Sequence, residues 1–88
     1  MNKKVDDSKM FKVDVYKAVS YYNIHSTTGV KLTVLKLMKY LHPTWTDSYA
    51  RSMCSWWKKG DGRYRPTLTD INLIRDKTGC PINLFVEH

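Results

Sequence analysis

The chain has 88 residues, of which 42% are hydrophobic and 12% aromatic, which suits one small globular core and argues against disorder throughout. Fifteen Lys and Arg residues against eight Asp and Glu residues give a formal charge of +7, which favours a polyanionic partner. No apolar run approaches the roughly 20 residues that span a bilayer, and the charged N-terminus does not have the form of a signal peptide, so we expect a cytoplasmic protein without membrane contact.

Residues 1–9 are mostly charged or polar, and they cannot bury enough apolar surface to compensate for the entropy lost on ordering. We expect them to form a flexible arm. Such an arm can touch phosphates or a minor groove, although a frayed terminus is the commoner outcome. The remaining residues, 10–88, are expected to form a single domain.

A first helix is predicted over about residues 11–22. Its apolar residues recur at helical spacing: Phe11, Val15, Val19 and Tyr22. Ser8 is available as a cap. The residues at positions 11, 13 and 15 also alternate as in a strand and are rich in β-formers, so residues 10–16 remain open between helix and strand.

The clearest amphipathic pattern predicts a second helix over about residues 31–41. Its apolar positions follow one face: Val34, Leu35, Met38 and Leu41. The lysines of the segment point elsewhere. His42 precedes Pro43, and a residue before proline is disfavoured in the helical region, so the helix is expected to end there.

A third helix is predicted over about residues 47–59. Thr46 or Asp47 can cap its first turn, and Gly60 can end it with a positive φ. Helical spacing places four residues on the inward side: Ala50, Met53, Cys54 and Trp57. The opposite side carries polar groups: Ser48, Arg51, Ser52, Ser55 and Lys59. One face can therefore be buried while the other presents hydrogen-bond donors.

A fourth helix is predicted over about residues 67–77, capped by Thr67 or Thr69. Its inward residues are expected to be Leu68, Ile71 and either Ile74 or Leu73. Gly79 marks its end. A short last element over residues 82–86 follows Pro81, and its apolar side chains are expected to close the core.

Few residues of the chain are candidates for metal binding or catalysis. Cys54 and Cys80, taken with His25 and His42, fit no usual zinc spacing, so we expect no metal and no cofactor, and interpret both cysteines as small core residues. The chain has no recognisable nucleophile elbow, no metalloprotease motif and no phosphate-binding loop. We therefore expect a protein that is not an enzyme and has no small-molecule substrate.

Two segments carry a family resemblance. Residues 49–60 have a polar start, an inward Cys54, Trp57 before the closing turn and a terminal glycine. Residues 66–85 have a proline, an amphipathic decapeptide, a glycine and an Ile/Leu/Phe cluster. Together they resemble the third, fourth and beginning of the fifth helix of the Cro and λ-repressor-like (Xre) helix-turn-helix family. The resemblance implies an all-α bundle of four to five helices.

The segment before Tyr49 departs from the family pattern. Its second helix has Leu37 or Met38 where the family has a central alanine, and His42 where the family has a glycine. The turn that follows is several residues longer than usual. An alternative alignment takes residues 46–53 as the second helix and residues 68–77 as the helix that contacts bases, but it leaves a basic loop between them.

The resemblance implies a sequence-specific binder of double-stranded DNA that regulates transcription, for example a phage or prokaryotic repressor, with its third helix in the major groove. Dimerisation on a palindrome is expected, because one short helix contacts only about four base pairs. The expected base contacts are Ser48, Arg51, Ser52 and Ser55. The expected phosphate contacts are Lys31, Thr33, Lys58, Lys59, Arg63, Tyr64 and Arg65.

Two other functions remain open. The aromatic residues, among them Trp45 and Trp56, are sufficient to form stacking surfaces for RNA or single-stranded DNA. The same fold also suits a protein-binding module, such as an antitoxin or a phage inhibitor, that does not bind DNA.

Overall fold

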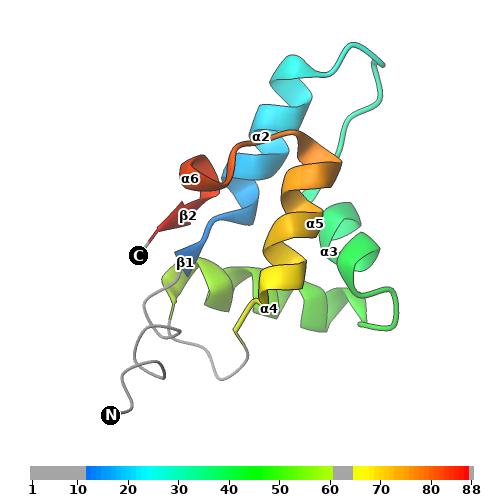
Figure 1. The fold of residues 1–88 in the computed structure, drawn as a ribbon. Coiled ribbons are helices and arrows are strands. Elements are labelled where there is room, and N and C mark those ends of the chain that lie inside the picture. Colours follow the sequence, from blue (N-terminus) through cyan, green and yellow to red (C-terminus); the bar gives the residue numbers. More distant parts are fainter. Residues whose placement is uncertain (1–11, 61–64, 88) are drawn as a thin grey trace.

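The computed structural model describes residues 12–60 and 65–87, whose elements follow one another as shown in Figure 1. They are β1 (Lys12–Val13), α2 (Val15–His25), α3 (Val34–Leu41), α4 (Asp47–Lys59), α5 (Leu68–Thr78), α6 (Ile82–Phe85) and β2 (Val86–Glu87). The described part of the chain is mostly helical, as the sequence predicts, but it also contains a pair of very short strands. The expected arm, residues 1–9, lies outside the described residues.

The first helix begins later than expected. The predicted start at residue 11 is wrong, because residues 12–13 form β1 and α2 starts only at Val15. Asp14 supplies the cap: its side chain accepts a hydrogen bond from the Lys17 backbone N–H at 3.1 Å. The helix then continues beyond the expected end at residue 22, to His25. The strand alternative for this region was therefore correct for two residues.

The second helix is shorter than its predicted range of 31–41. It starts at Val34, because Thr33 is the cap and its hydroxyl accepts from the Lys36 backbone N–H at 3.1 Å. The segment just before it is attached to α2 through Asn23. That side chain donates to the Leu32 carbonyl at 2.9 Å and accepts from the Leu32 N–H at 2.8 Å. The end of α3 is as predicted.

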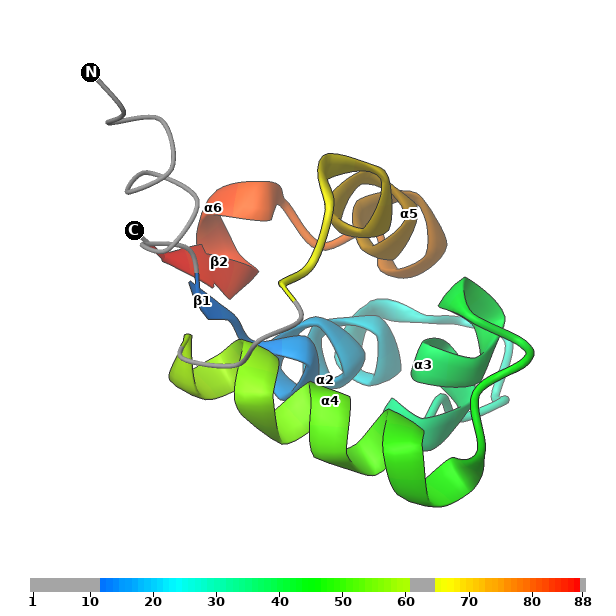
Figure 2. The same cartoon turned by 90° about the horizontal axis from the view of Figure 1, so that it is seen from below.

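α4 has the predicted bounds. The Thr46 hydroxyl accepts from the Tyr49 N–H at 3.1 Å, and Gly60 ends the helix with φ +78°. The helix is continuous past Met53, so the range of 46–53 that the alternative alignment gave it is too short. α4 lies along one side of the molecule in Figure 1, packs against α3 and β1, and crosses in front of α2 in Figure 2.

α5 starts with a capping box between Thr67 and Asp70 and ends at Gly79, which has φ +76°. Ile71 and Ile74 are buried as expected. The prediction for Leu68 is wrong, since 71% of it is exposed. Leu68 is the first residue of the helix, and side chains point back toward a helix's N-terminus, so it lies beyond the end of the core.

The C-terminal segment is not the single short element expected over 82–86. α6 ends at Phe85, and Val86 belongs to β2, which pairs antiparallel with β1 so that Val86 lies opposite Val13. The Asp14 backbone N–H also donates to the Phe85 carbonyl at 2.7 Å. These bonds join the two ends of the described domain.

The core draws on nearly every element. Its largest fully buried side chains are Trp57 and Phe85, from α4 and α6. Cys54 and Cys80 are buried with free thiols, which confirms their interpretation as core residues. None of the described helices is long and apolar enough to cross a bilayer.

Candidate nucleic-acid interface

The inward face of α4 holds the helix rigidly against the domain. The four residues expected on this face are at most 2% exposed: Ala50, Met53, Cys54 and Trp57. Each fully buried large side chain of this kind contributes roughly 1.5–3 kcal/mol. Because these residues are spaced by three or four positions, the burial fixes the rotation of α4 about its own axis.

The outward face of α4 carries the residues expected to contact base edges. Ser48, Arg51, Ser52 and Lys59 are exposed, and Ser55 is half-buried. Their spacing places them along one side of the helix, opposite the anchoring residues. The structure thus brings the four expected base-contacting residues together on a single surface.

This surface has a positive balance. Arg51 and Lys59 have no ion-pair partner among the described residues. Asp47, the acidic residue of α4, is neutralised by Lys39 of α3, whose Nζ lies 3.1 Å from Asp47 Oδ1. Lys58 lies 5.3 Å from the centre of the Tyr16 ring. An approaching phosphate would therefore meet cations with little competition from carboxylates.

The linker between α3 and α4, residues 42–46, is packed despite its length. The His42 ring stacks on Trp45 with centroids 3.9 Å apart and an interplanar angle of 11°. His42 Nε2 lies 2.9 Å from Oδ1 of Asp70, a residue of α5 that is only 4% exposed. The linker therefore attaches the start of α4 to both α3 and α5. Sequence reasoning did not find this contact, because it joins residues 28 positions apart.

The expected phosphate-contacting residues are not all equivalent in the structure. Lys31 is exposed, while the Thr33 hydroxyl is engaged in capping α3. Arg65 is half-buried, and its Nη1 donates to the Gly60 carbonyl at 3.4 Å, at the end of α4. Lys58 and Lys59, at the end of α4, are exposed, and the remaining two expected contacts, Arg63 and Tyr64, lie outside the described residues.

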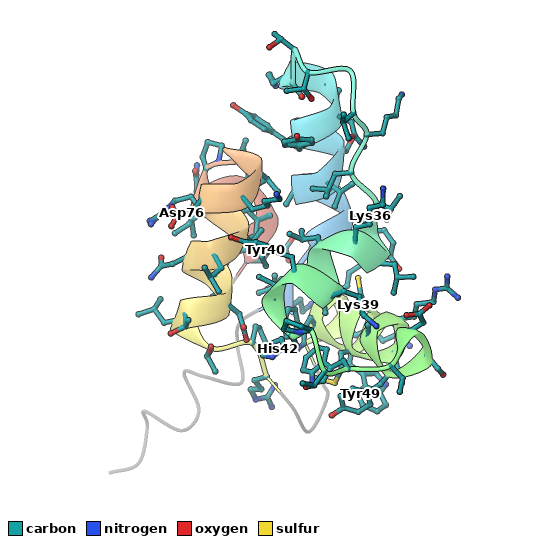
Figure 3. The ribbon with its side chains drawn as sticks, turned by 90° about the vertical axis from the view of Figure 1, so that its right-hand side faces the viewer. Lys36, Lys39, Tyr40, His42, Tyr49 and Asp76 are labelled. Atoms are coloured by element: carbon teal, nitrogen blue, oxygen red, sulfur yellow. The ribbon has the colours of Figure 1, made fainter. Side chains whose placement is uncertain are left out.

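A second set of polar residues gathers away from α4, and the sequence reasoning missed it. Tyr22, Lys36, Tyr40 and Lys77 line a pocket between α2, α3 and α5. Lys36 and Tyr40 project from one side of α3 (Figure 3). Their i, i+4 spacing was visible in the sequence. The approach of Tyr22 and Lys77 was not, because it depends on how three helices pack.

Metal binding and thiol chemistry gain no support from the described residues. No three His, Cys, Asp or Glu side chains among them gather closely enough to hold a metal ion. Burial raises the pKa of the Cys54 thiol from 9.0 to about 11, and burial also raises that of Cys80. Both thiols are therefore protonated near neutral pH, which makes them poor nucleophiles and poor ligands.

Comparison with known proteins adds no relative. The chain matches no protein-family model, and neither a curated protein nor a solved structure matches it. The function is therefore inferred from the geometry of α4 and of its surroundings.

Proposed function

We propose that this protein binds double-stranded DNA with α4 in the major groove and regulates transcription, as a repressor of prokaryotic or phage type. The observation that carries the proposal is the two-sided character of α4, which is buried on one face and polar and cationic on the other. Thirteen residues make a helix about 20 Å long. A helix of this kind fits a major groove about 12 Å wide.

Arg51 is the residue proposed to provide most of the discrimination between bases. Its side chain is exposed and near the middle of α4, and it has no ion pair among the described residues. A guanidinium can donate to guanine O6 and N7 together, which is worth about 1–3 kcal/mol against the wrong base. The serines of the same face bond to bases or phosphates with less discrimination.

The lysines around α4 are proposed to bind the phosphate backbone. Lys58 and Lys59 occupy the last turn of α4, and Lys31 is exposed just before α3. The net charge of +7 strengthens attraction to DNA without regard to sequence. The capping role of Thr33 and the bond from Arg65 to Gly60 make those two residues weaker candidates for phosphate contact than the lysines.

In this proposal α3 and α4 form the helix-turn-helix unit of a λ-repressor-like domain, with residues 42–46 as a long but packed turn. The contacts of His42 with Trp45 and Asp70 support the fixed orientation of α4 that groove binding requires. A homodimer on a palindromic site would double the number of base contacts.

Stacking of single-stranded bases is less well supported. Trp57 is buried. Trp45 is half-buried, with its ring already stacked on His42 and in T-shaped contact with Tyr49 and Trp57, so it is less available to stack on a base. Trp56 is half-buried and packs against the core.

Selection of binding sites from random duplexes tests the proposal. The expected result is enrichment of a palindrome, with loss of about tenfold or more in affinity on Arg51→Ala. Arg75→Ala is the matched control, because Arg75 is also an exposed helical arginine but lies on α5 and pairs with Asp76 at 3.1 Å. Equal losses from the two variants would contradict a specific role for Arg51.

Two results would contradict the proposal, and each would favour one of the other two functions. Tighter binding of single strands, lost on Trp56→Ala, would assign the protein to the single-strand binders. Absence of nucleic-acid binding at about 50 mM salt, where phosphate contacts are strongest, would favour a protein-binding module.

Salt dependence tests the phosphate contacts separately. Lys59→Ala is expected to weaken the binding of all duplexes to the same extent, and to reduce the slope of log K against log salt by about 0.9. Lys17→Ala, which removes an exposed lysine from α2, is the control and should change the slope less. An unchanged slope in the Lys59 variant would remove this residue from the phosphate contacts.

A further inference from the structure

The pocket between α2, α3 and α5 has a composition suited to a ligand of a different kind. It has a volume of about 240 Å³. Its lining residues come from three helices and from the loop before α3: Tyr22, Val30, Lys31, Leu32, Lys36, Tyr40 and Lys77. The lining contains three lysines and no carboxylate, and it includes no residue of α4.

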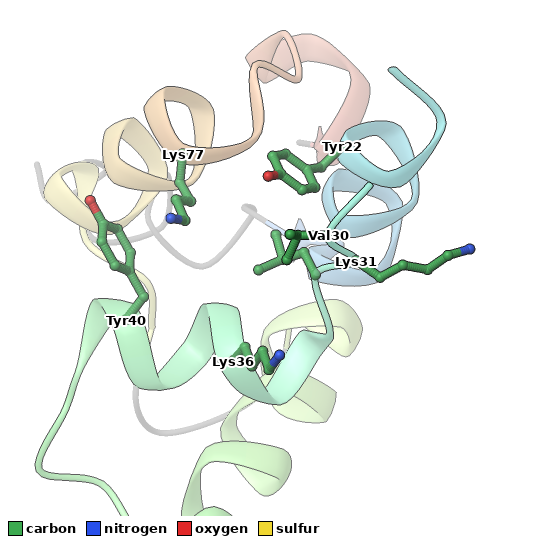
Figure 4. Close-up of a pocket in the computed structure, with 7 residues that line it drawn as sticks. Tyr22, Val30, Lys31, Lys36, Tyr40 and Lys77 are labelled. Carbon is green, nitrogen blue, oxygen red and sulfur yellow. The ribbon is translucent and has the colours of Figure 1, made fainter. Parts of the chain in front are cut away.

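The inner polar groups of the pocket converge. Figure 4 shows Lys77 and Tyr22 directed into the space from opposite sides, with Tyr40 beside Lys77, while the end of Lys31 points away. The Lys77 Nζ lies 5.0 Å from the centre of the Tyr40 ring. Hydrogen bonds from Ser26 and Thr28, and the charge of Lys77, lower the pKa of the Tyr22 hydroxyl. Of these causes, the charge of Lys77 is the one that acts from within the pocket lining, and it favours negative charge there.

The cations of the pocket are not neutralised within the protein. Lys36 and Lys77 have no carboxylate partner among the described residues, and the nearby Asp76 is paired with Arg75. Uncompensated like charges around one hollow repel each other, and a bound anion would relieve that repulsion. Val30 and Leu32 supply an apolar wall, which a bare inorganic ion would not use.

We propose that this pocket binds a small organic anion, an aromatic carboxylate or aryl phosphate, with its oxyanion between Lys77 and the Tyr22 hydroxyl and its ring against Val30 and Tyr40. The volume suits a single ring with one charged group, since pockets for larger drug-sized ligands usually exceed about 300 Å³. The site is separate from the base-contacting face proposed for α4. It shares Lys31 with the proposed phosphate contacts, but the end of that side chain points away from the pocket.

Titration of the full chain with phenyl phosphate, followed by calorimetry and amide chemical shifts without DNA, tests the proposal. The expected dissociation constant is on the order of 1 mM for so small a ligand. Inorganic phosphate and benzyl alcohol should each bind about tenfold more weakly, because inorganic phosphate lacks the ring and benzyl alcohol lacks the negative charge. Equal binding of inorganic phosphate would reduce the site to a charged patch and overturn the proposal, as would absence of binding.

Matched variants locate the site. Lys77→Gln is expected to weaken the binding of phenyl phosphate about tenfold or more, because it removes a charge-assisted hydrogen bond. Lys17→Gln makes the same charge change at an exposed lysine of α2 outside the pocket and should have no effect. Val30→Glu places a carboxylate at a residue that is 64% exposed, so the fold is kept and binding should be lost. Similar losses in the Lys77 and Lys17 variants would overturn the proposal.

A DNA titration separates the pocket from the DNA-binding surface. If the pocket is independent, Lys77→Gln leaves the salt dependence of duplex binding unchanged. A reduction of the slope by about 0.9, as expected for a phosphate contact, would show that the pocket belongs to the nucleic-acid footprint and would overturn the proposal. Failure to bind DNA at all would contradict the proposed function, while the phenyl phosphate titration would still decide about the pocket.

Discussion

Trp57 combines the largest buried surface of α4 with an unsatisfied polar group. The residue is 2% exposed, and its Nε1 has no hydrogen-bond partner among the described residues. A buried donor without a partner costs about 1–3 kcal/mol, which offsets part of what the ring contributes by burial. The indole therefore stabilises the fold through burial of its ring and not through its N–H group.

This balance predicts different costs for two substitutions of Trp57. Trp57→Phe leaves a smaller ring but removes the unsatisfied donor, so we expect a loss of about 1 kcal/mol or less in the free energy of unfolding. Trp57→Ala should lose about 3–5 kcal/mol. Urea unfolding followed by circular dichroism measures both. Equal losses would indicate that the N–H group has a partner, such as a bound water.

The Cys54 thiol makes stability depend on alkaline pH. Its pKa in the folded protein is about 11, above the ordinary 9.0, so the folded state holds the proton more tightly than the unfolded state does. The resulting stabilisation is complete below pH 9 and is lost as the pH rises through 11. Because a tenfold change in proton affinity corresponds to about 1.4 kcal/mol, this stabilisation amounts to roughly 2–3 kcal/mol.

We therefore expect the free energy of unfolding to fall between pH 9 and 11, and to fall less steeply in Cys54→Ala. Equilibrium unfolding at several pH values measures the difference in slope. Between pH 6 and 8 the two proteins should have parallel profiles, which is the internal control. Identical slopes above pH 9 would show that other groups cause the alkaline loss.

Among the elements, the linker before α4 depends on one carboxylate of α5. Asp70 accepts from the Thr67 backbone N–H at 3.0 Å and bonds His42 Nε2 at 2.9 Å. It therefore closes the first turn of α5 and holds the linker at the same time. Removing it takes a partner from two groups, the Thr67 backbone N–H and the half-buried His42 ring.

Asp70→Ala is expected to cost about 2–3 kcal/mol in the free energy of unfolding, by loss of the cap and of the His42 bond. Asp76→Ala is the matched control, since Asp76 is an exposed partner of Arg75 and should cost about 0.5 kcal/mol or less. A double-mutant cycle of Asp70→Asn with His42→Gln should give a coupling of about 0.5–3 kcal/mol. No coupling would mean that the contact does not hold the linker.

How far the sequence predicts each element depends on the distance over which its determinants act. α4 was predicted correctly because its cap at Thr46, its inward spacing and its terminal Gly60 are all local. β1 was expected only as an alternative to the start of the first helix, because two residues form a strand only when β2 is present to pair with them. The outward face of α4 followed from helical spacing in the same way.

The parts of the candidate sites that the sequence did not reveal all involve contacts between distant elements. The His42 contact with Asp70 joins the linker to α5, and the pocket brings Tyr22 of α2 close to Lys77 of α5. Neither contact leaves a periodic pattern in the sequence, since each member lies on a different helix. Packing of those helices determines both.

At the scale of the whole molecule, the packing of the helices places two cationic regions on different parts of one small domain. α4 runs along one side of the molecule (Figure 1), and the pocket between α2, α3 and α5 (Figure 4) is lined by no residue of α4. α3 contributes to both, because it packs against α4 and also provides Lys36 and Tyr40. A domain with a single core must hold both regions in place through the same buried residues.

Phe85 tests whether this domain unfolds as one unit. It lies near the C-terminus, is 1% exposed, and its carbonyl accepts from the Asp14 N–H, so it joins α6 to the start of α2. Phe85→Ala should lose about 3–5 kcal/mol, a large share of the 5–15 kcal/mol typical of a domain. The neighbouring Leu84→Ala, at a residue that is 46% exposed, is the control and should cost much less.

Because α6 shares its core with α4, we expect the tryptophan fluorescence of Trp45, Trp56 and Trp57 and the helical circular dichroism to shift together in the Phe85 variant. A fluorescence midpoint that stays at the wild-type urea concentration while part of the dichroism is lost earlier would show that the C-terminal segment unfolds separately. In that case the strand pair would be a local attachment, and the orientation of α4 would depend on α2, α3 and α5 alone.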